Sequence, residues 1–185
     1  MTGTLKKLIF VAFIVCGILL GVPNSAPAAQ EVKEIFLISS FLGESHANLK
    51  KIHRLANEMK SQARPFSSKR HRDRYRFEPG DKIPREIMSL SRKMSASFKM
   101  INGVLHQSDV KNKEIIFKQF FDATDSLSTF CKRAIRANRD NNYALYLASA
   151  QGIEKEVAIG NDLLNDLEIA INNSIAESDA RKESL

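Results

Sequence analysis

The stretch that decides the fold of this chain reads PREIMSLSRKMSASFKMINGVL and covers residues 84–105. Its apolar side chains recur in a rhythm close to seven, at Ile87, Leu90, Met94, Phe98, Ile101 and Leu105. This spacing places them along one face of a helix, where they pack against a neighbouring element. Pro84 is favoured in a first helical turn, because its missing amide hydrogen needs no partner there. The stretch therefore predicts an amphipathic helix that begins at Pro84.

Three further segments have apolar positions at the same helical spacing. In residues 30–63 these are Ile35, Ile38, Leu42, Leu49, Ile52, Leu55, Ala56 and Met59, with Gly43 and Ser45 weakening the middle. In the next segment, which ends among residues 138–140, they are Ile116, Phe117, Phe120, Phe121, Leu127, Phe130, Ala134 and Ile135. In the last, which we expect to run to about Ile175, they are Tyr143, Leu147, Ala150, Ile153, Val157, Leu164, Leu167 and Ile171. Each segment predicts a helix with one buried face.

Side-chain oxygens indicate where the last two helices begin. Ser108 and Asp109 are expected to cap the third helix, and Asp140 and Asn141 the fourth, because such oxygens accept hydrogen bonds from unpaired first-turn amides. Three small residues at steps of four predict that the fourth helix approaches a neighbour closely: Ala144, Ala148 and Gly152. Gly160 is expected to loosen or bend this helix, since glycine is about 1 kcal/mol less favourable than alanine there.

The four amphipathic segments show no alternating pattern of the kind that strands have. They predict an all-α fold, an antiparallel up-and-down four-helix bundle, because short connections force consecutive helices to lie side by side. Residues 29–178 are the expected bundle domain, and residues 179–185 a polar tail. The first connection, residues 64–83, is a long basic loop, and a loop of that length in a compact domain is typical of a functional or mobile segment.

The first 28 residues have the pattern of an export signal. Lys6 and Lys7 precede an apolar run without charge, residues 8–22, and Ala26, Pro27 and Ala28 supply the small residues that a signal peptidase recognises. We expect residues 1–28 to be a signal peptide cleaved before Ala29, which would place the mature protein in the periplasm or outside the cell. An uncleaved anchor is the alternative, but this run is shorter than the roughly 20 residues that span a bilayer as a helix.

Basic charge is concentrated in one short segment. From Ala29 on, the chain has 26 Lys and Arg residues and 21 Asp and Glu residues. Residues 64–76 contain six of these basic residues and one acid, Asp73, so the remainder has 20 of each sign. The net charge of +5 from Ala29 on therefore lies entirely in residues 64–76.

We call residues 64–76 the basic segment. Its candidate partner-binding residues are Arg64, Lys69, Arg70, Arg72, Arg74, Tyr75 and Arg76. Arginine binds phosphate and carboxylate groups through two parallel hydrogen bonds, and an aromatic ring can rest at a membrane surface. Export argues against nucleic acid, so the expected partner is an anionic surface, such as lipid headgroups or a cell-wall polymer, or an acidic protein. The alternative is a solvated loop whose charges pair with Glu78, Asp81 and carboxylates on the helix faces.

No motif in the sequence specifies a reaction or a cofactor. There is no Cys-x-x-Cys-His haem motif, no Glu-x-x-His pair and no glycine-rich phosphate loop. His46 and His53 share a helix face but lie about 10.5 Å apart along the axis, too far to hold one ion. A haem between His106 or His46 and a methionine such as Met94 or Met59 stays open, although helical methionines usually fill a core. We expect no cofactor and no metal.

The remaining candidates have a structural interpretation beside a functional one. Cys131 is expected to be a small buried residue, with intermolecular pairing or a reactive thiol as the alternatives. Asp162 and Asp166 lie four residues apart and suit either paired carboxylates or a solvated face. Four phenylalanines favour a core over a ligand pocket: Phe117, Phe120, Phe121 and Phe130. We therefore expect a non-enzymatic exported protein that binds a partner through the basic segment, with a bundle holding a small molecule, haem or metal between its helices as the alternative.

Overall fold

The computed structural model describes residues 26–106 and 108–183, and over these residues it is all-helical, with no strand. The elements are α2 (Ala26–Ala63), the 3-10 helix η1 (Arg64–Ser67), α3 (Lys69–Arg72), α4 (Lys82–Leu105), α5 (Lys113–Arg139) and α6 (Tyr143–Glu183). The predicted all-α class is confirmed. In this part of the chain, no helix combines the length and the apolar character needed to cross a membrane.

The chain divides into two units, Met1–Ser40 and Phe41–Leu185. Of the first unit, the structure describes only residues 26–40, which belong to α2. Most of the predicted signal peptide lies outside the described residues, and the predicted cleavage site before Ala29 falls in the first turn of α2. Export therefore stays a prediction, and the account that follows concerns the second unit.

The predicted apolar stripes form the interior of this second unit. All six predicted positions of α4 are buried, and so are all those of α2 from Leu42 on. In α5 the stripe is buried except for Phe121 and Phe130, which are half-buried. In α6 the middle of the stripe, from Ala150 to Leu167, is buried. Helical periodicity thus identified the core-facing side of each long helix correctly.

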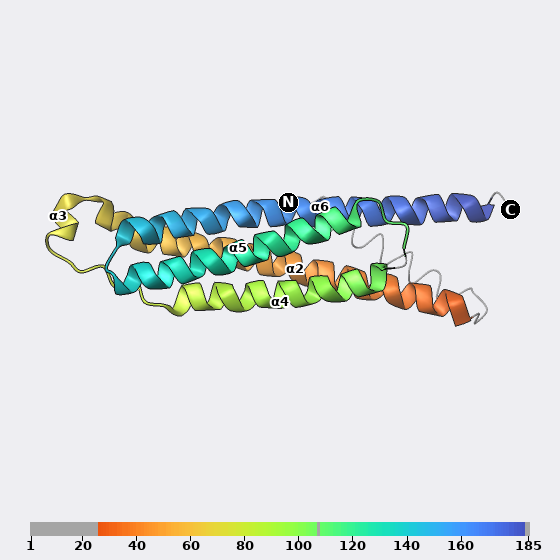
Figure 1. Cartoon of the computed structure of the whole chain (residues 1–185), viewed down its shortest axis with the longest axis horizontal. Helices are drawn as coiled ribbons and strands as arrows, with labels where there is room; N and C mark the ends of the chain where they lie inside the picture. Colours follow the sequence, from red (N-terminus) through yellow and green to blue (C-terminus); the bar gives the residue numbers. More distant parts are fainter. Residues whose placement is uncertain (1–25, 107, 184–185) are drawn as a thin grey trace. The chain divides into compact units, whose positions relative to one another are not determined.

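Figure 1 shows α4, α5 and α6 side by side, and contacts between these helices bring their stripes together. The rings of Phe98 on α4 and Phe120 on α5 are stacked, with centroids 3.4 Å apart and planes within 5° of parallel. At the edge of the core, Lys51 on α2 forms an ion pair of 2.7 Å with Glu86 on α4. The hydrogen bond that Lys51 donates within this pair lowers the pKa of the Glu86 carboxyl. The α2–α4 contact therefore includes a charged pair beside its apolar stripe.

Two glycines on α6 allow close packing. A Cβ atom at Gly152 would lie 2.4 Å from the Phe130 ring of α5, and one at Gly160 would lie 3.1 Å from the Leu49 side chain of α2. The predicted row of small residues was right only at Gly152, because Ala144 and Ala148 are exposed. Helix α6 continues through Gly160, where it lies against Leu49 of α2, and the expected loosening or bend stays a prediction.

The predicted helix caps are corrected by the structure. Helix α5 begins at Lys113, after Asn112 in the left-handed region (φ 61°), and not directly after Ser108 and Asp109. Ser108 instead donates a hydrogen bond of 2.7 Å to the carbonyl of Leu105, at the end of α4. Ser108, expected to cap the beginning of α5, therefore contacts the end of α4 instead.

The start of α6 also differs from the prediction. Asn142, not Asp140 or Asn141, accepts the hydrogen bond from the amide of Leu145, at 3.0 Å. Asn141 takes a left-handed backbone conformation (φ 53°) that turns the chain between α5 and α6. Helix α6 then runs to Glu183, beyond the predicted end near Ile175 and into the expected polar tail.

Candidate binding surface at the basic segment

The basic segment is folded rather than a continuous loop. Pro65 opens the short turn η1, where its fixed φ suits a first helical position. After Ser68, α3 forms one helical turn, and the amides of Arg74 and Tyr75 continue it by donating to the carbonyl of His71. Figure 1 shows this turn at one end of the unit, beside the connection between α5 and α6. The predicted loop, residues 64–83, thus contains two helical turns before α4 begins at Lys82.

Phe77 anchors the end of the segment to this connection. Its side chain is 3% exposed, and its backbone amide donates a hydrogen bond of 2.8 Å to Oδ1 of Asn141. Its ring packs edge-on against Tyr146 of α6, with centroids 5.2 Å apart, and against Phe66 at 4.9 Å. A buried aromatic side chain contributes roughly 1.5–3 kcal/mol relative to an exposed one. The segment is therefore held on the α5–α6 connection by Phe77, the residue that follows it, and by its own Phe66 packed against Phe77.

Arg72 closes the segment internally. Its Nη1 donates to the carbonyls of Phe66 and Ser67 at 2.9 and 2.8 Å, and to the hydroxyl of Tyr143 at 3.0 Å. The guanidinium group also lies over the Tyr143 ring, 5.1 Å from its centroid. All these partners are neutral, so Arg72 keeps its full charge while its position is fixed. It is a positioning residue rather than a free contact residue.

Tyr75 presents an aromatic ring among the cations. The ring of His71 lies between those of Phe66 and Tyr75, with centroid separations of 4.7 and 4.6 Å. Phe66 is half-buried, whereas Tyr75 is 59% exposed. Its exposed ring is available to a partner.

Most cations of the segment form no ion pair with an acid within the described residues. Four of the predicted binding residues are exposed and form no ion pair or hydrogen bond through their side chains within the described part of the chain: Arg64, Lys69, Arg70 and Arg74. Arg76 pairs with Glu78 at 3.1 Å, and both of these side chains are largely exposed. Asp81, the other acid expected to neutralise the segment, instead contacts Arg85 at 3.3 Å and Asn138 at 3.0 Å. Local acids therefore leave most of the basic charge uncompensated.

The residues considered for haem or metal have other contacts or surroundings in the described chain. His46 lies 3.0 Å from Glu168, and His53 contacts Asn57 on its own helix. His106 is exposed, whereas Met59 and Met94 are buried in the core. Within residues 26–106 and 108–183, no group of three or more His, Cys, Asp or Glu residues is placed to hold a metal ion.

Cys131 is fully buried, and desolvation raises the pKa of its thiol to about 12. The thiol is therefore protonated at neutral pH, whereas the thiolate is the reactive form. This agrees with the expected role of a small core residue.

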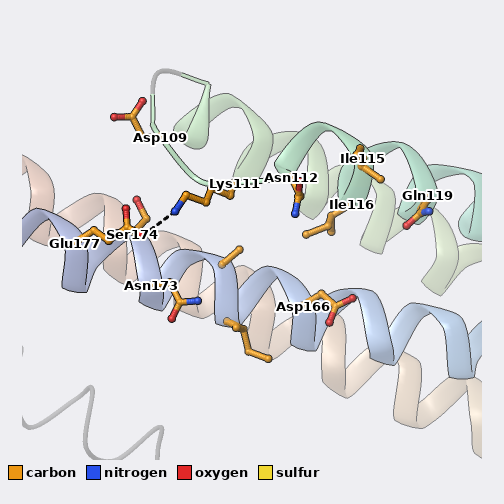
Figure 2. Close-up of a pocket in the computed structure, with 12 residues that line it drawn as sticks. Asp109, Lys111, Asn112, Ile115, Ile116, Gln119, Asp166, Asn173, Ser174 and Glu177 are labelled. Carbon is orange, nitrogen blue, oxygen red and sulfur yellow. Dashed lines mark hydrogen bonds and ion pairs between the residues drawn. The ribbon is translucent and has the colours of Figure 1, made fainter.

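A second feature, which sequence reasoning missed, is a groove of about 530 Å³ between the start of α5 and the last third of α6. Ile115 on α5 and Ile169 on α6 line it, and each is 58% exposed. Polar side chains line the groove as well, among them Asp109 and Asp166 (Figure 2). Asp162 and Asp166 are both exposed, which agrees with the solvated face, and of the two only Asp166 lines the groove. One sequence feature could have indicated the groove: Ile115 and Ile169 are apolar residues that lie outside the predicted buried stripes.

Comparisons with protein-family models, with curated proteins and with solved structures found no match to this chain.

Proposed function

We propose that this chain is an exported, non-enzymatic protein that binds an anionic surface or an acidic protein through its basic segment. In this proposal α2, α4, α5 and α6 form an antiparallel four-helix bundle that serves as the scaffold. The single observation that carries the proposal is the set of four exposed cations without acidic partners: Arg64, Lys69, Arg70 and Arg74. Solvent-exposed charges of one sign attract anionic surfaces and give binding that weakens with salt.

The packing of the segment supports a binding role over that of a solvated loop. Phe77 and Arg72 fix the segment to the α5–α6 connection through neutral contacts, which leaves the other cations free. A segment that is already ordered loses less conformational entropy when it binds. The exposed ring of Tyr75 adds a group that suits the interface of a lipid bilayer, where aromatic rings with a polar end are favoured.

The test is binding to vesicles that contain anionic lipid. The binding variant carries glutamine at the four free cations (R64Q, K69Q, R70Q and R74Q). The matched control carries glutamine at four exposed basic residues elsewhere (K50Q, R92Q, K93Q and K118Q), so both variants lose the same charge. Each Lys or Arg near an anionic membrane contributes about 1 kcal/mol, so we expect the loss of four cations to weaken binding by up to about a thousandfold.

The control variant should bind almost as well as the natural protein, and the melting temperatures of all three should agree, because the altered side chains are exposed. Equal loss of binding in both variants would show that net charge matters and the segment does not. Undiminished binding in the binding variant would reject the proposal. Sequencing the amino terminus of protein recovered from the exported fraction tests the export step separately, with Ala29 as the expected first residue.

A further inference from the structure

The groove between α5 and α6 combines an apolar floor with an acidic rim. Its exposed apolar residues are Ile115 and Ile169, which lie on opposite sides of it. Asp109 and Asp166 stand on its rim, and both are exposed with no ion pair within the described residues. Lys111 is the single basic residue that lines it, and it is paired with Glu177 at 2.9 Å. The groove therefore favours an occupant that has positive charge and an apolar or aromatic group.

The acidic character continues along the same two helices. A second hollow of about 320 Å³ lies between α5 and α6 and shares Gln119 with the groove. Asp122 of α5 and Glu156 and Ile159 of α6 line it. The Glu156 carboxyl is partly shielded from water, and this desolvation raises its pKa. A cation placed next to it would restore favourable interactions for its charged form. The two hollows together have five carboxylates and one lysine in their lining.

The chain contains one segment with the matching chemistry. The basic segment has a net charge of +5 and carries the exposed ring of Tyr75 among its free cations. It cannot reach the groove of its own molecule, because it is anchored to Asn141 and Tyr146 beyond the opposite end of α5. Helix α5 has 27 residues and is about 40 Å long. Any contact between segment and groove must therefore join two molecules.

We propose that the groove between α5 and α6 binds the basic segment of a second copy of this chain. The cations of the segment face Asp109, Asp122 and Asp166, and the ring of Tyr75 contacts Ile115 and Ile169. The proposal rests on the proposed binding role of the basic segment and names its acidic protein partner. Because the two surfaces differ, the groove of one molecule takes the segment of another, and such contacts form open chains unless they close into a ring or a reciprocal dimer. An anionic surface competes for the same cations and separates these chains.

The test uses two variants with reversed charge and sedimentation velocity at low salt. The segment variant is K69E, R70E and R74E, and the groove variant is D109K, D122K and D166K; all six side chains are exposed. The natural protein should show an average mass that rises with concentration and falls when salt is added. Each variant alone should be monomeric, because it lacks one of the two surfaces. An equal mixture of natural protein and either variant should form shorter chains than the natural protein alone.

A cross-combination gives the sharpest result. The acidic segment of the segment variant matches the lysines in the groove of the groove variant. In the same mixture, the natural segment of the groove variant matches the natural groove of the segment variant. Mixing the two should therefore restore association, although each is monomeric alone. A symmetric contact between two grooves predicts instead that the segment variant, whose groove is natural, still associates by itself. A monomeric natural protein at about 100 μM and low salt, or a failure of the mixture to associate, would overturn the proposal.

Vesicle binding separates this proposal from the proposed function. The groove variant should retain salt-sensitive binding to anionic vesicles and lose only self-association, whereas the segment variant should lose both. Self-association that persists in the groove variant would overturn the groove as the site without affecting the proposed function. Loss of vesicle binding in the segment variant with unchanged self-association would overturn the self-docking proposal and leave the vesicle contact standing.

Discussion

At the scale of single residues, Lys113 shows how a charged side chain can terminate a helix. Its side chain is only 7% exposed, and Nζ donates to the carbonyls of Leu105, His106 and Ser108 at 2.7, 3.1 and 2.6 Å. The carbonyls at the end of a helix lack partners within it, and a cation there also interacts favourably with the helix dipole. Lys113 thus stabilises the end of α4 from the first position of α5.

Replacing Lys113 by methionine should destabilise the protein by about 2 kcal/mol, because it removes three charge-assisted hydrogen bonds and leaves carbonyls without partners. The free energy of unfolding in urea measures this effect. The substitution K118M, at an exposed lysine on the same helix, is the control and should change that energy by less than about 0.5 kcal/mol. Equal effects of the two substitutions would contradict the assigned role of Lys113.

Two helical glycines should respond in opposite directions to replacement by alanine. At Gly152 the new methyl group would overlap the Phe130 ring, so G152A should destabilise the protein by about 1–3 kcal/mol. At Gly103 nothing lies within 4 Å of the new atom, so G103A should stabilise it by up to about 1 kcal/mol through helix propensity. Thermal unfolding of both variants measures the difference. A stabilised G152A would contradict the close contact between α5 and α6.

At the scale of elements, periodicity predicted the helices well and their ends poorly. The stripe of α4 could be read from residues 84–105 because one buried face imposes a repeat on the sequence. The start of α5 was misplaced because Ser108 can bond backward to α4 as readily as forward, and the choice depends on Lys113 across the turn. The fold of the basic segment was not predictable either, because it depends on contacts of Phe77 and Arg72 with α6 and its preceding turn.

The basic segment should be released when Arg72 is changed to lysine. Lysine keeps the charge but lacks the planar group that bonds two carbonyls and the Tyr143 hydroxyl while lying over its ring. We expect amides in residues 68–75 to exchange their hydrogens severalfold faster in R72K, with the exchange of α4 and α5 unchanged. The control R70K, at an exposed and unpaired arginine, should leave the exchange of the segment as it was. Uniform exchange in all three proteins would contradict the positioning role.

At the scale of the whole molecule, charge count located the candidate site but could not show its surroundings. The sequence places six basic residues in 64–76, and the exposure of four of them depends on Asp81 turning to Arg85 and Asn138. The groove was invisible to sequence reasoning because Ile115 and Ile169 are far apart in the chain and outside both stripes. The sequence alone could not show which exposed residues of α5 and α6 lie side by side.

The chain contains no tryptophan, so one introduced at Tyr75 reports on the basic segment alone. The fluorescence of a Y75W variant, titrated with vesicles that contain anionic lipid, is the most direct measurement of the central claim. We expect the emission to shift to shorter wavelength with anionic vesicles and to return when salt is added, because screening removes the contact of the exposed cations. Purely zwitterionic vesicles should cause no shift. An emission spectrum that stays unchanged with anionic vesicles at low salt would contradict the claim that this segment contacts an anionic surface.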